Sequence, residues 1–190
     1  MKKTDMRVQV TRKVLRESLV ALMKTKSILN ISVREICEAA GVSRSTFYTY
    51  CTDQYELLGQ MEEEILDELN KLIQRHAPTG DMPPARELAM LLEDAMQYIA
   101  SNSNSVQVFL SENGASDFQK KFSKYITVHV RQLKNAKNSS MIDEETLNYC
   151  SVFIRDGCTG IIQEWLKNGM NTSVHDMAKL FTKLVRGVLG

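Results

Sequence analysis

The stretch from Ser32 to Leu58, SVREICEAAGVSRSTFYTYCTDQYELL, decides the fold of this chain. It opens with a serine followed three residues later by Glu35, the pattern of a capping box at the start of a helix. Gly41 is expected to end that helix, because glycine takes a positive φ at little cost. Ser43 then caps a second helix, predicted over residues 44–50. Two short helices joined by so tight a turn indicate a helix-turn-helix.

The second of these helices is predicted to have one buried and one exposed face. Ile36, Ala40, Val42 and Phe47 are expected to pack together where the two helices cross. The exposed face then carries donors for phosphates and base edges, namely Arg44, Ser45, Tyr48 and Thr49. A helix N-terminus favours anions, and such a helix fits the major groove, which is about 12 Å wide. The stretch therefore predicts binding to double-stranded DNA.

The charge of the chain is unevenly distributed along its 190 residues. Residues 1–52 hold ten Lys or Arg and four acidic residues, a charge of +6, which leaves −5 on the other 138 residues. A basic front end on an acidic body indicates a polyanion-binding module joined to a different module, although a solvated basic face would give the same totals. We expect one domain over 1–52 and a second over 53–190.

Almost every other segment has the periodicity of an amphipathic helix, and no stretch alternates as a strand does. Helices are predicted over 11–23, 53–75, 106–110, 117–135 and 143–167, with a last helix from Ser173. Another amphipathic helix is predicted to carry Leu88, Leu91, Leu92, Ala95 and Ile99. The run APTGDMPP at 77–84 is the clearest loop. The fold class is therefore expected to be all-α.

Residues 10 to 60 resemble the DNA-binding region of the TetR (tetracycline-repressor) family of transcriptional regulators. The family pattern is a Thr/Ser-capped helix ending A-G-V-S, followed by T-F/L-Y-x-H-F-x-x-K-x-x-L. This chain supplies Ser32, Ile36, Ala40, Gly41, Val42, Ser43, Thr46, Phe47, Tyr48 and Leu57. The resemblance implies an N-terminal three-helix DNA-binding domain and a C-terminal helical domain for ligand binding and dimerisation.

Family roles are expected at the matching positions. The resemblance implies that Arg44, Ser45 and Thr46 face bases or nearby phosphates, and that Ser32, Ser43 and Tyr48 hold phosphates. The full predicted DNA-binding set is Ser32, Arg34, Ser43, Arg44, Ser45, Thr46, Tyr48, Thr49 and Tyr50.

The chain departs from the family pattern at three positions. Tyr50 replaces the usual His, Cys51 the usual Phe, and Gln54 the usual Lys. Losing one lysine contact to phosphate lowers the salt dependence of binding by roughly one unit of slope.

The C-terminal helices are expected to pair two chains, as the resemblance implies. Glycine inside the 143–167 helix costs up to about 1 kcal/mol, which close approach of another helix, from a partner or from the same chain, would offset. The predicted interface is Gly157, Gly160, Ile161, Trp165, Phe181, Leu184 and Val188. A homodimer would set two recognition helices roughly 34–36 Å apart and would therefore bind a palindromic operator.

Methionine and aromatic residues in the body suggest an apolar effector pocket, although such residues more often form plain core. The candidates are Met96, Tyr98, Phe109, Phe122, Tyr125, Tyr149 and Phe153. The expected function is a repressor that a small apolar effector releases from DNA. The alternative is a coactivator controlled by a protein partner, because the tail from Gly160 to Ala178 loosely resembles a TetR subgroup that includes activators of dihydroxyacetone utilisation.

Several functions are not expected. The sequence has no nucleophile motif or phosphate-binding glycine loop, so we expect no enzyme activity and no cofactor. Four cysteines without C-x-x-C spacing and three scattered histidines predict no metal site. No apolar run approaches the roughly 18 residues of a membrane span, and no signal peptide is recognisable, so the expected location is the cytoplasm.

Overall fold

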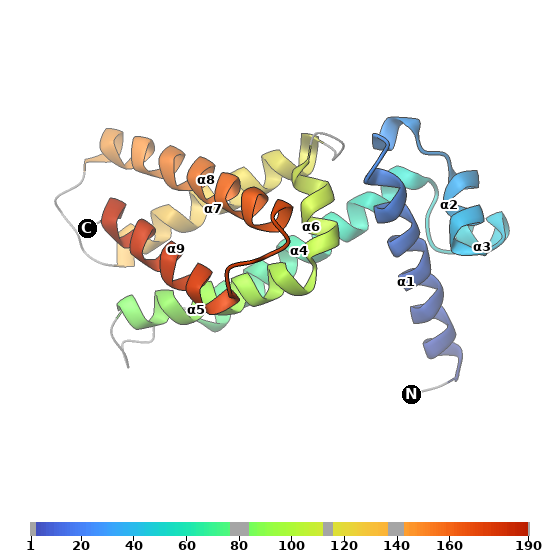
Figure 1. Ribbon diagram of the computed structural model, residues 1–190, viewed down its shortest axis with the longest axis horizontal. Coiled ribbons are helices and arrows are strands. Elements are labelled where there is room, and N and C mark those ends of the chain that lie inside the picture. Colours follow the sequence, from blue (N-terminus) through green and yellow to red (C-terminus); the bar gives the residue numbers. More distant parts are fainter. Residues whose placement is uncertain (1–2, 77–83, 112–115, 137–142, 190) are drawn as a thin grey trace. The chain divides into compact units, whose positions relative to one another are not determined.

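The computed structural model describes residues 3–76, 84–111, 116–136 and 143–189, and these contain helices and no strand (Figure 1). The chain divides into two compact units. The first unit holds residues 1–65 and 108–118, and the second holds residues 66–107 and 119–190. The all-α expectation is confirmed for the described residues.

The first unit contains the predicted helix-turn-helix. Its elements are α1 (Lys3–Met23), a short 3₁₀ turn (Ile28–Asn30), α2 (Val33–Ala40), α3 (Arg44–Tyr48) and the start of α4 (Gln54–Arg75). The core comes from the apolar faces of these helices and includes Leu15, Leu19, Met23, Ile36, Phe47, Leu57 and Leu58, each at most 3% exposed.

The second unit holds the rest of α4 and most of the later helices. The later helices are α5 (Pro84–Ser101), α6 (Ser103–Leu110), α7 (Ser116–Ala136), α8 (Glu144–Lys167) and α9 (Val174–Leu189), of which residues 108–110 of α6 and 116–118 of α7 belong to the first unit. Leu88, Val130, Leu147, Ile154, Val185 and Leu189 form a buried cluster that joins four of these helices. Figure 1 shows α9 beside α5 and α8, and these helices pack against it.

The predicted boundaries fit the structure with three differences. The first helix begins at Lys3 rather than residue 11, because residues 3–10 contain no proline or glycine and continue the same helix. Helix α3 ends at Tyr48 rather than 50, and α6 begins at Ser103 rather than 106. The loop predicted at 77–84 falls on residues 77–83, outside the described residues, and on Pro84, which begins α5.

The four cysteines are all free thiols. Cys37 and Cys51 are buried in the first unit, and burial raises the pKa of each thiol. Cys158 lies in the second unit, where burial raises its pKa to about 12. Across the described helices, none is long and apolar enough to cross a bilayer.

Candidate functional sites

Local hydrogen bonds fix the start of α2, and a left-handed glycine begins the turn between α2 and α3. The Ser32 Oγ accepts from the Glu35 backbone N–H at 3.3 Å, while Glu35 Oε2 accepts from the Ser32 N–H at 2.9 Å, so the predicted capping box is present. Gly41 ends α2 with φ +64°, a left-handed conformation that glycine adopts without strain. The backbone therefore holds α3 at a defined angle to α2.

The Glu35 carboxylate also ties the start of α2 to the segment that follows α1. Lys26 Nζ donates to Glu35 Oε1 at 2.6 Å. Hydrogen bonds from Lys26, first, and from Ser32 lower the pKa of Glu35 to about 2. The carboxylate is thus ionised and bonded on both sides throughout the neutral range.

Helix α3 has the two faces that the sequence predicts. Phe47 is fully buried, whereas the side chain of the next residue, Tyr48, is 58% exposed and meets the Phe47 ring edge-on at 5.7 Å between centroids. Arg44 is exposed on the same short helix. Among the described residues, neither Arg44 nor Tyr48 has a hydrogen-bond or ion-pair partner, so both are free to meet a ligand.

The serine and threonine hydroxyl groups at the start and end of α3 form hydrogen bonds within the helix and its N-cap. The Ser43 Oγ accepts from the Thr46 N–H at 3.1 Å and lies 2.8 Å from both the Ser45 and Thr46 hydroxyls. Thr49 Oγ1 donates to the Ser45 carbonyl oxygen at 3.0 Å. These hydroxyls already stabilise α3, so a hydroxyl that also contacted a DNA phosphate would have to keep or exchange its bond within the helix.

Two further predicted contact residues also have partners within the first unit. Arg34 Nε donates to Glu38 Oε1 at 2.6 Å on the exposed side of α2. The Arg12 guanidinium of α1 lies over the Tyr50 ring, 5.6 Å from its centroid. Arg12 was not among the predicted contact residues, since no linear motif links α1 to the segment that follows α3. This cation–π contact adds a basic residue beside the position where the family usually has His.

The other two positions that depart from the TetR family pattern are Cys51 and Gln54. Cys51 is 4% exposed and fills part of the small core. Gln54 is the first residue of α4 and is half-buried, directly after Asp53, whose carboxylate accepts from the Glu56 N–H at 2.8 Å. The departures therefore lie at the start of α4, beside the helix-turn-helix.

The second unit contains an apolar cavity of about 130 Å³ that is partly open to solvent. Three of the predicted pocket residues line it, namely Met96, Phe122 and Tyr125. Tyr98, Phe109, Tyr149 and Phe153 do not. Phe109 is fully buried in the first unit against Phe118, and Tyr149 and Phe153 are 69% and 63% exposed on the surface of α8.

The cavity also has a small polar side. The Tyr125 ring meets the His129 ring edge-on at 4.5 Å between centroids, and both residues line the cavity. Burial raises the pKa of the Tyr125 phenol well above its ordinary value, so the phenol stays neutral. Within the described part of the chain, its hydroxyl has no hydrogen-bond partner, which leaves it available to a bound molecule.

Two residues of the predicted dimer interface lie inside the chain instead. Trp165 is 4% exposed and its indole N–H donates to the Thr172 carbonyl oxygen at 2.9 Å, whereas Phe181 is 1% exposed and lines the cavity. A side chain already buried in its own chain has no surface left for a partner. Their assignment to the interface is therefore corrected.

A different apolar face is exposed on α8 and α9. On α8 it contains Tyr149, Phe153, Gly157 and Gly160, which recur at spacings of four, four and three and so share one helix face. On α9 it contains the exposed Leu180 and Leu184 and the half-buried Val188, at spacings of four. We call these seven residues the apolar flank. Of the predicted interface residues, Gly157, Gly160, Leu184 and Val188 belong to it, and half-buried Ile161 adjoins it.

The two glycines of α8 are not needed for packing within the chain. A Cβ placed on Gly157 or Gly160 would meet no atom within 4 Å among the described residues. Intrachain close approach, one of the two explanations open from the sequence, is thus absent at these positions. The described residues also contain no group of three or more His, Cys, Asp or Glu arranged to hold a metal ion.

Comparisons with known proteins agree with this architecture. A "Probable acrEF/envCD operon repressor" of Escherichia coli is 24% identical over 99% of this chain and 89% of its own length. An "Uncharacterized HTH-type transcriptional regulator YxbF" of Bacillus subtilis is 34% identical over 59 residues, a match that spans 31% of this chain and only 16% of that protein.

Solved structures show the same fold. A TetR-like transcriptional regulator from Rhodococcus sp. RHA1 superposes with a TM-score of 0.72 at 14% identity, covering 95% of this chain and 96% of its own. The dihydroxyacetone kinase operon activator DhaS superposes with a TM-score of 0.61 at 19% identity, covering 94% and 96%.

A match to a protein-family model shows which family the chain belongs to. The model of a TetR-family transcriptional regulator C-terminal region matches residues 86–187, which is more than half of the chain. With the helix-turn-helix in the first unit and the helical second unit, the chain belongs to the TetR family of transcriptional regulators.

Proposed function

We propose that this chain binds a palindromic DNA operator as a homodimer and that a small apolar effector releases it. The observation that carries the DNA part is the surface of α3. A tightly capped turn presents Arg44 and Tyr48 to solvent with no partner among the described residues. Arginine and tyrosine donors on a second helix of this motif suit phosphates and base edges in the major groove.

The apolar flank supports the homodimer. Large apolar side chains that gather on one exposed face mark interaction surfaces in proteins of this size. Glycines at two positions of the same face allow a second helix to come close to α8. A symmetric pair of chains would present two copies of α3, and a palindrome is the DNA sequence that matches this symmetry.

The cavity in the second unit supports a small effector. Its volume of about 130 Å³ is below the roughly 300–1,000 Å³ of drug-sized ligand sites, and cavities near this size hold a benzene-sized molecule. A compact apolar molecule with one acceptor for the Tyr125 hydroxyl fits best. Effector binding would favour a conformation in which the two α3 helices no longer match the operator.

The test is fluorescence anisotropy with an operator selected from DNA that flanks the gene. We expect saturable binding that weakens as salt increases, because phosphate contacts release counterions. Arg44→Ala and Tyr48→Ala are expected to weaken binding strongly. Tyr55→Ala is the matched control, since Tyr55 is also exposed, at 47%, but lies outside the predicted contact set. Equal binding by all three variants and the wild type would contradict the proposal.

The start of α4 favours one alternative, a coactivator controlled by a protein partner. Gln54 cannot supply the charged phosphate contact of the usual lysine. If a partner protein changes operator affinity and small apolar molecules do not, this alternative replaces effector release. The cytoplasmic location remains a prediction.

A further inference from the structure

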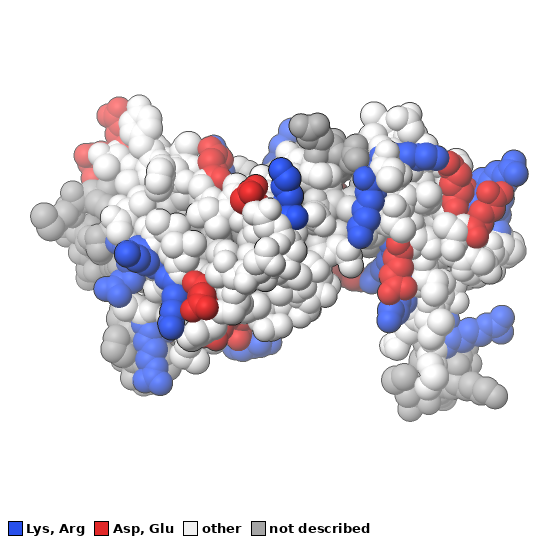
Figure 2. Space-filling model, in the orientation of Figure 1, with Lys and Arg blue, Asp and Glu red and all other residues white. Residues whose placement is uncertain are grey.

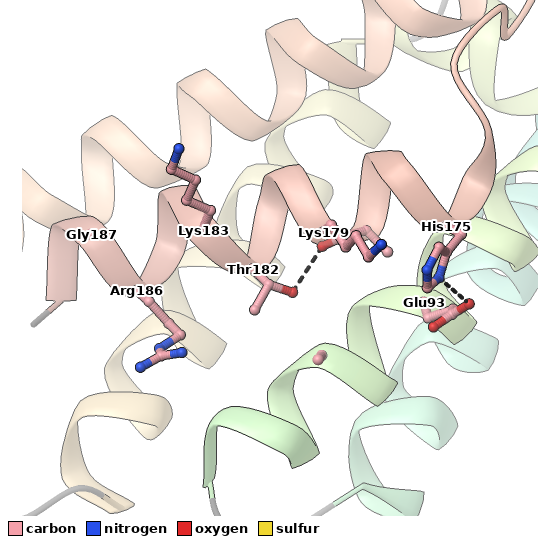
Figure 3. A pocket seen from close by; sticks show the side chains of 9 residues that line it. Glu93, His175, Lys179, Thr182, Lys183, Arg186 and Gly187 are labelled. Carbon is pink, nitrogen blue, oxygen red and sulfur yellow. Dashed lines mark hydrogen bonds and ion pairs between the residues drawn. The ribbon is translucent and has the colours of Figure 1, made fainter.

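A second hollow lies on the surface of the second unit, between α5 and α9, apart from the apolar cavity (Figure 3). Its volume is about 580 Å³, within the roughly 300–1,000 Å³ of small-molecule sites. Ala89 of α5 and Ala178 of α9 are among the small residues that line it. Small side chains at these points leave space for a ligand to lie along the two helices.

The hollow is bordered mainly by positive charge. Lys179 and Arg186 are exposed residues of its α9 side, and Figure 3 shows both side chains extending from the helix beside the groove, whereas the Lys183 ammonium points away from α5. Arg86 lies on the same face of α5 as Ala89, three residues earlier. Lys and Arg gather over α9 and the adjoining part of α5 (Figure 2).

Glu93, the acidic residue that lines the groove, forms a hydrogen bond with His175. Glu93 Oε1 lies 3.0 Å from the Nδ1 of His175, and this pair occupies one end of the hollow (Figure 3). Thr182 donates its hydroxyl proton to the Ala178 carbonyl oxygen at 2.8 Å and so offers no donor to an anion. Among the described residues, Lys179 and Arg186 form no ion pair, so their charges are uncompensated at short range.

We infer that this groove binds a small phosphate-bearing molecule, with a diphosphate group held between Lys179 and Arg186. The two residues are seven positions apart, which places their Cα atoms about 10 Å apart along the helix. Long, flexible side chains rooted at that spacing reach one diphosphate from both sides, and the guanidinium can bind an oxygen pair in bidentate fashion. The small residues of the groove would accommodate the uncharged part of the ligand.

A concave site of this volume favours a small molecule over an acidic protein segment. The site also lies on the flank of α9 that carries basic residues, while Leu180, Leu184 and Val188 occupy the other flank. A homodimer through the apolar flank therefore leaves the groove open. This ligand is distinct from the apolar effector, and its site involves neither the cavity nor the first unit.

The experiment is isothermal titration calorimetry of the full chain with inorganic pyrophosphate at fixed ionic strength. We expect one saturable site per chain. The double variant Lys179→Gln/Arg186→Gln should weaken binding at least about tenfold, since two charge-assisted hydrogen-bonding groups are lost. The matched control, Lys124→Gln/Lys167→Gln, removes two exposed charges of α7 and α8 and should bind as the wild type does. Thermal melting of each variant checks that it is folded.

Three outcomes would overturn the inference. The first is no saturable binding of pyrophosphate by the folded wild type. The second is equal weakening in the groove variant and the control, which would show general charge attraction only. The third is binding of a poly-glutamate peptide that depends on Lys179 and Arg186 but is not displaced by pyrophosphate, which would assign the groove to an acidic protein segment.

Discussion

Replacing Phe153 by alanine is expected to separate the proposed dimer and leave each chain folded. Phe153 lies in the middle of the apolar flank on α8, and its side chain is 63% exposed in the single chain. Removing a side chain that contacts mainly solvent takes little from the core. The substitution therefore acts on association far more than on folding.

The size of the effect follows from the exposed area. If Phe153 exposes about 130 Å² and loses it in the dimer, burial contributes about 3 kcal/mol at about 25 cal/mol per Å². A two-fold symmetric interface contains the residue twice, so the variant loses up to about 6 kcal/mol, or roughly 10⁴-fold in the dimer dissociation constant. A wild-type dimer in the nanomolar range would become a monomer at micromolar concentration.

Sedimentation equilibrium over a range of concentrations measures this directly. Met90→Ala is the control, because Met90 is also exposed, at 42%, but lies on α5 outside the apolar flank. We expect the control to remain dimeric and both variants to melt at nearly the wild-type temperature. A Phe153→Ala protein that dimerises within about twofold of the wild type would refute the placement of the interface.

Three further predictions concern single positions. Gly160→Leu should break the dimer without unfolding the chain, because a Cβ at this exposed position meets no atom within 4 Å among the described residues; sedimentation that still shows a dimer would argue against close helix approach. Glu35→Ala should melt below the wild type at pH 7. Because the pKa of Glu35 is lowered from 4.5 to about 2, this stabilisation is present above pH 4.5 and is lost as the pH falls toward 2, so the melting difference should shrink over that interval; a difference that stays constant with pH would contradict it. Ala95→Leu should fill the apolar cavity and make operator binding insensitive to phenol, tested as a small effector, whereas Ala100→Leu on the same helix should not; loss of the phenol response in both, or in neither, would refute the cavity as the effector site.

The local signals in the sequence predicted the helix-turn-helix well. Ser32 with Glu35, Gly41 and Ser43 act through bonds between near neighbours, and short-range bonds are visible in the order of residues. The capping box and the positive φ of the glycine appear where the pattern puts them. Contacts between distant segments, such as Arg12 over Tyr50, leave no such signal.

The assignment of apolar residues to core, cavity or surface was less successful. Helices α8 and α9 carry large apolar residues on more than one side, so periodicity shows that they are amphipathic without showing which apolar side faces inward. Trp165 and Phe181 were expected outside and lie inside, whereas Tyr149 and Phe153 were expected around the cavity and lie on the surface. Only the packing of the other helices against them decides between these sides.

The most direct test of the central claim is operator binding by the wild-type chain to two DNA duplexes. One duplex carries the intact palindrome, and the other has one half-site scrambled. We predict that two chains bind the intact operator and that scrambling one half-site lowers the affinity at least about a hundredfold, because one of the two α3 helices loses its base contacts. Equal affinity for both duplexes would contradict a dimer that recognises DNA through paired α3 helices.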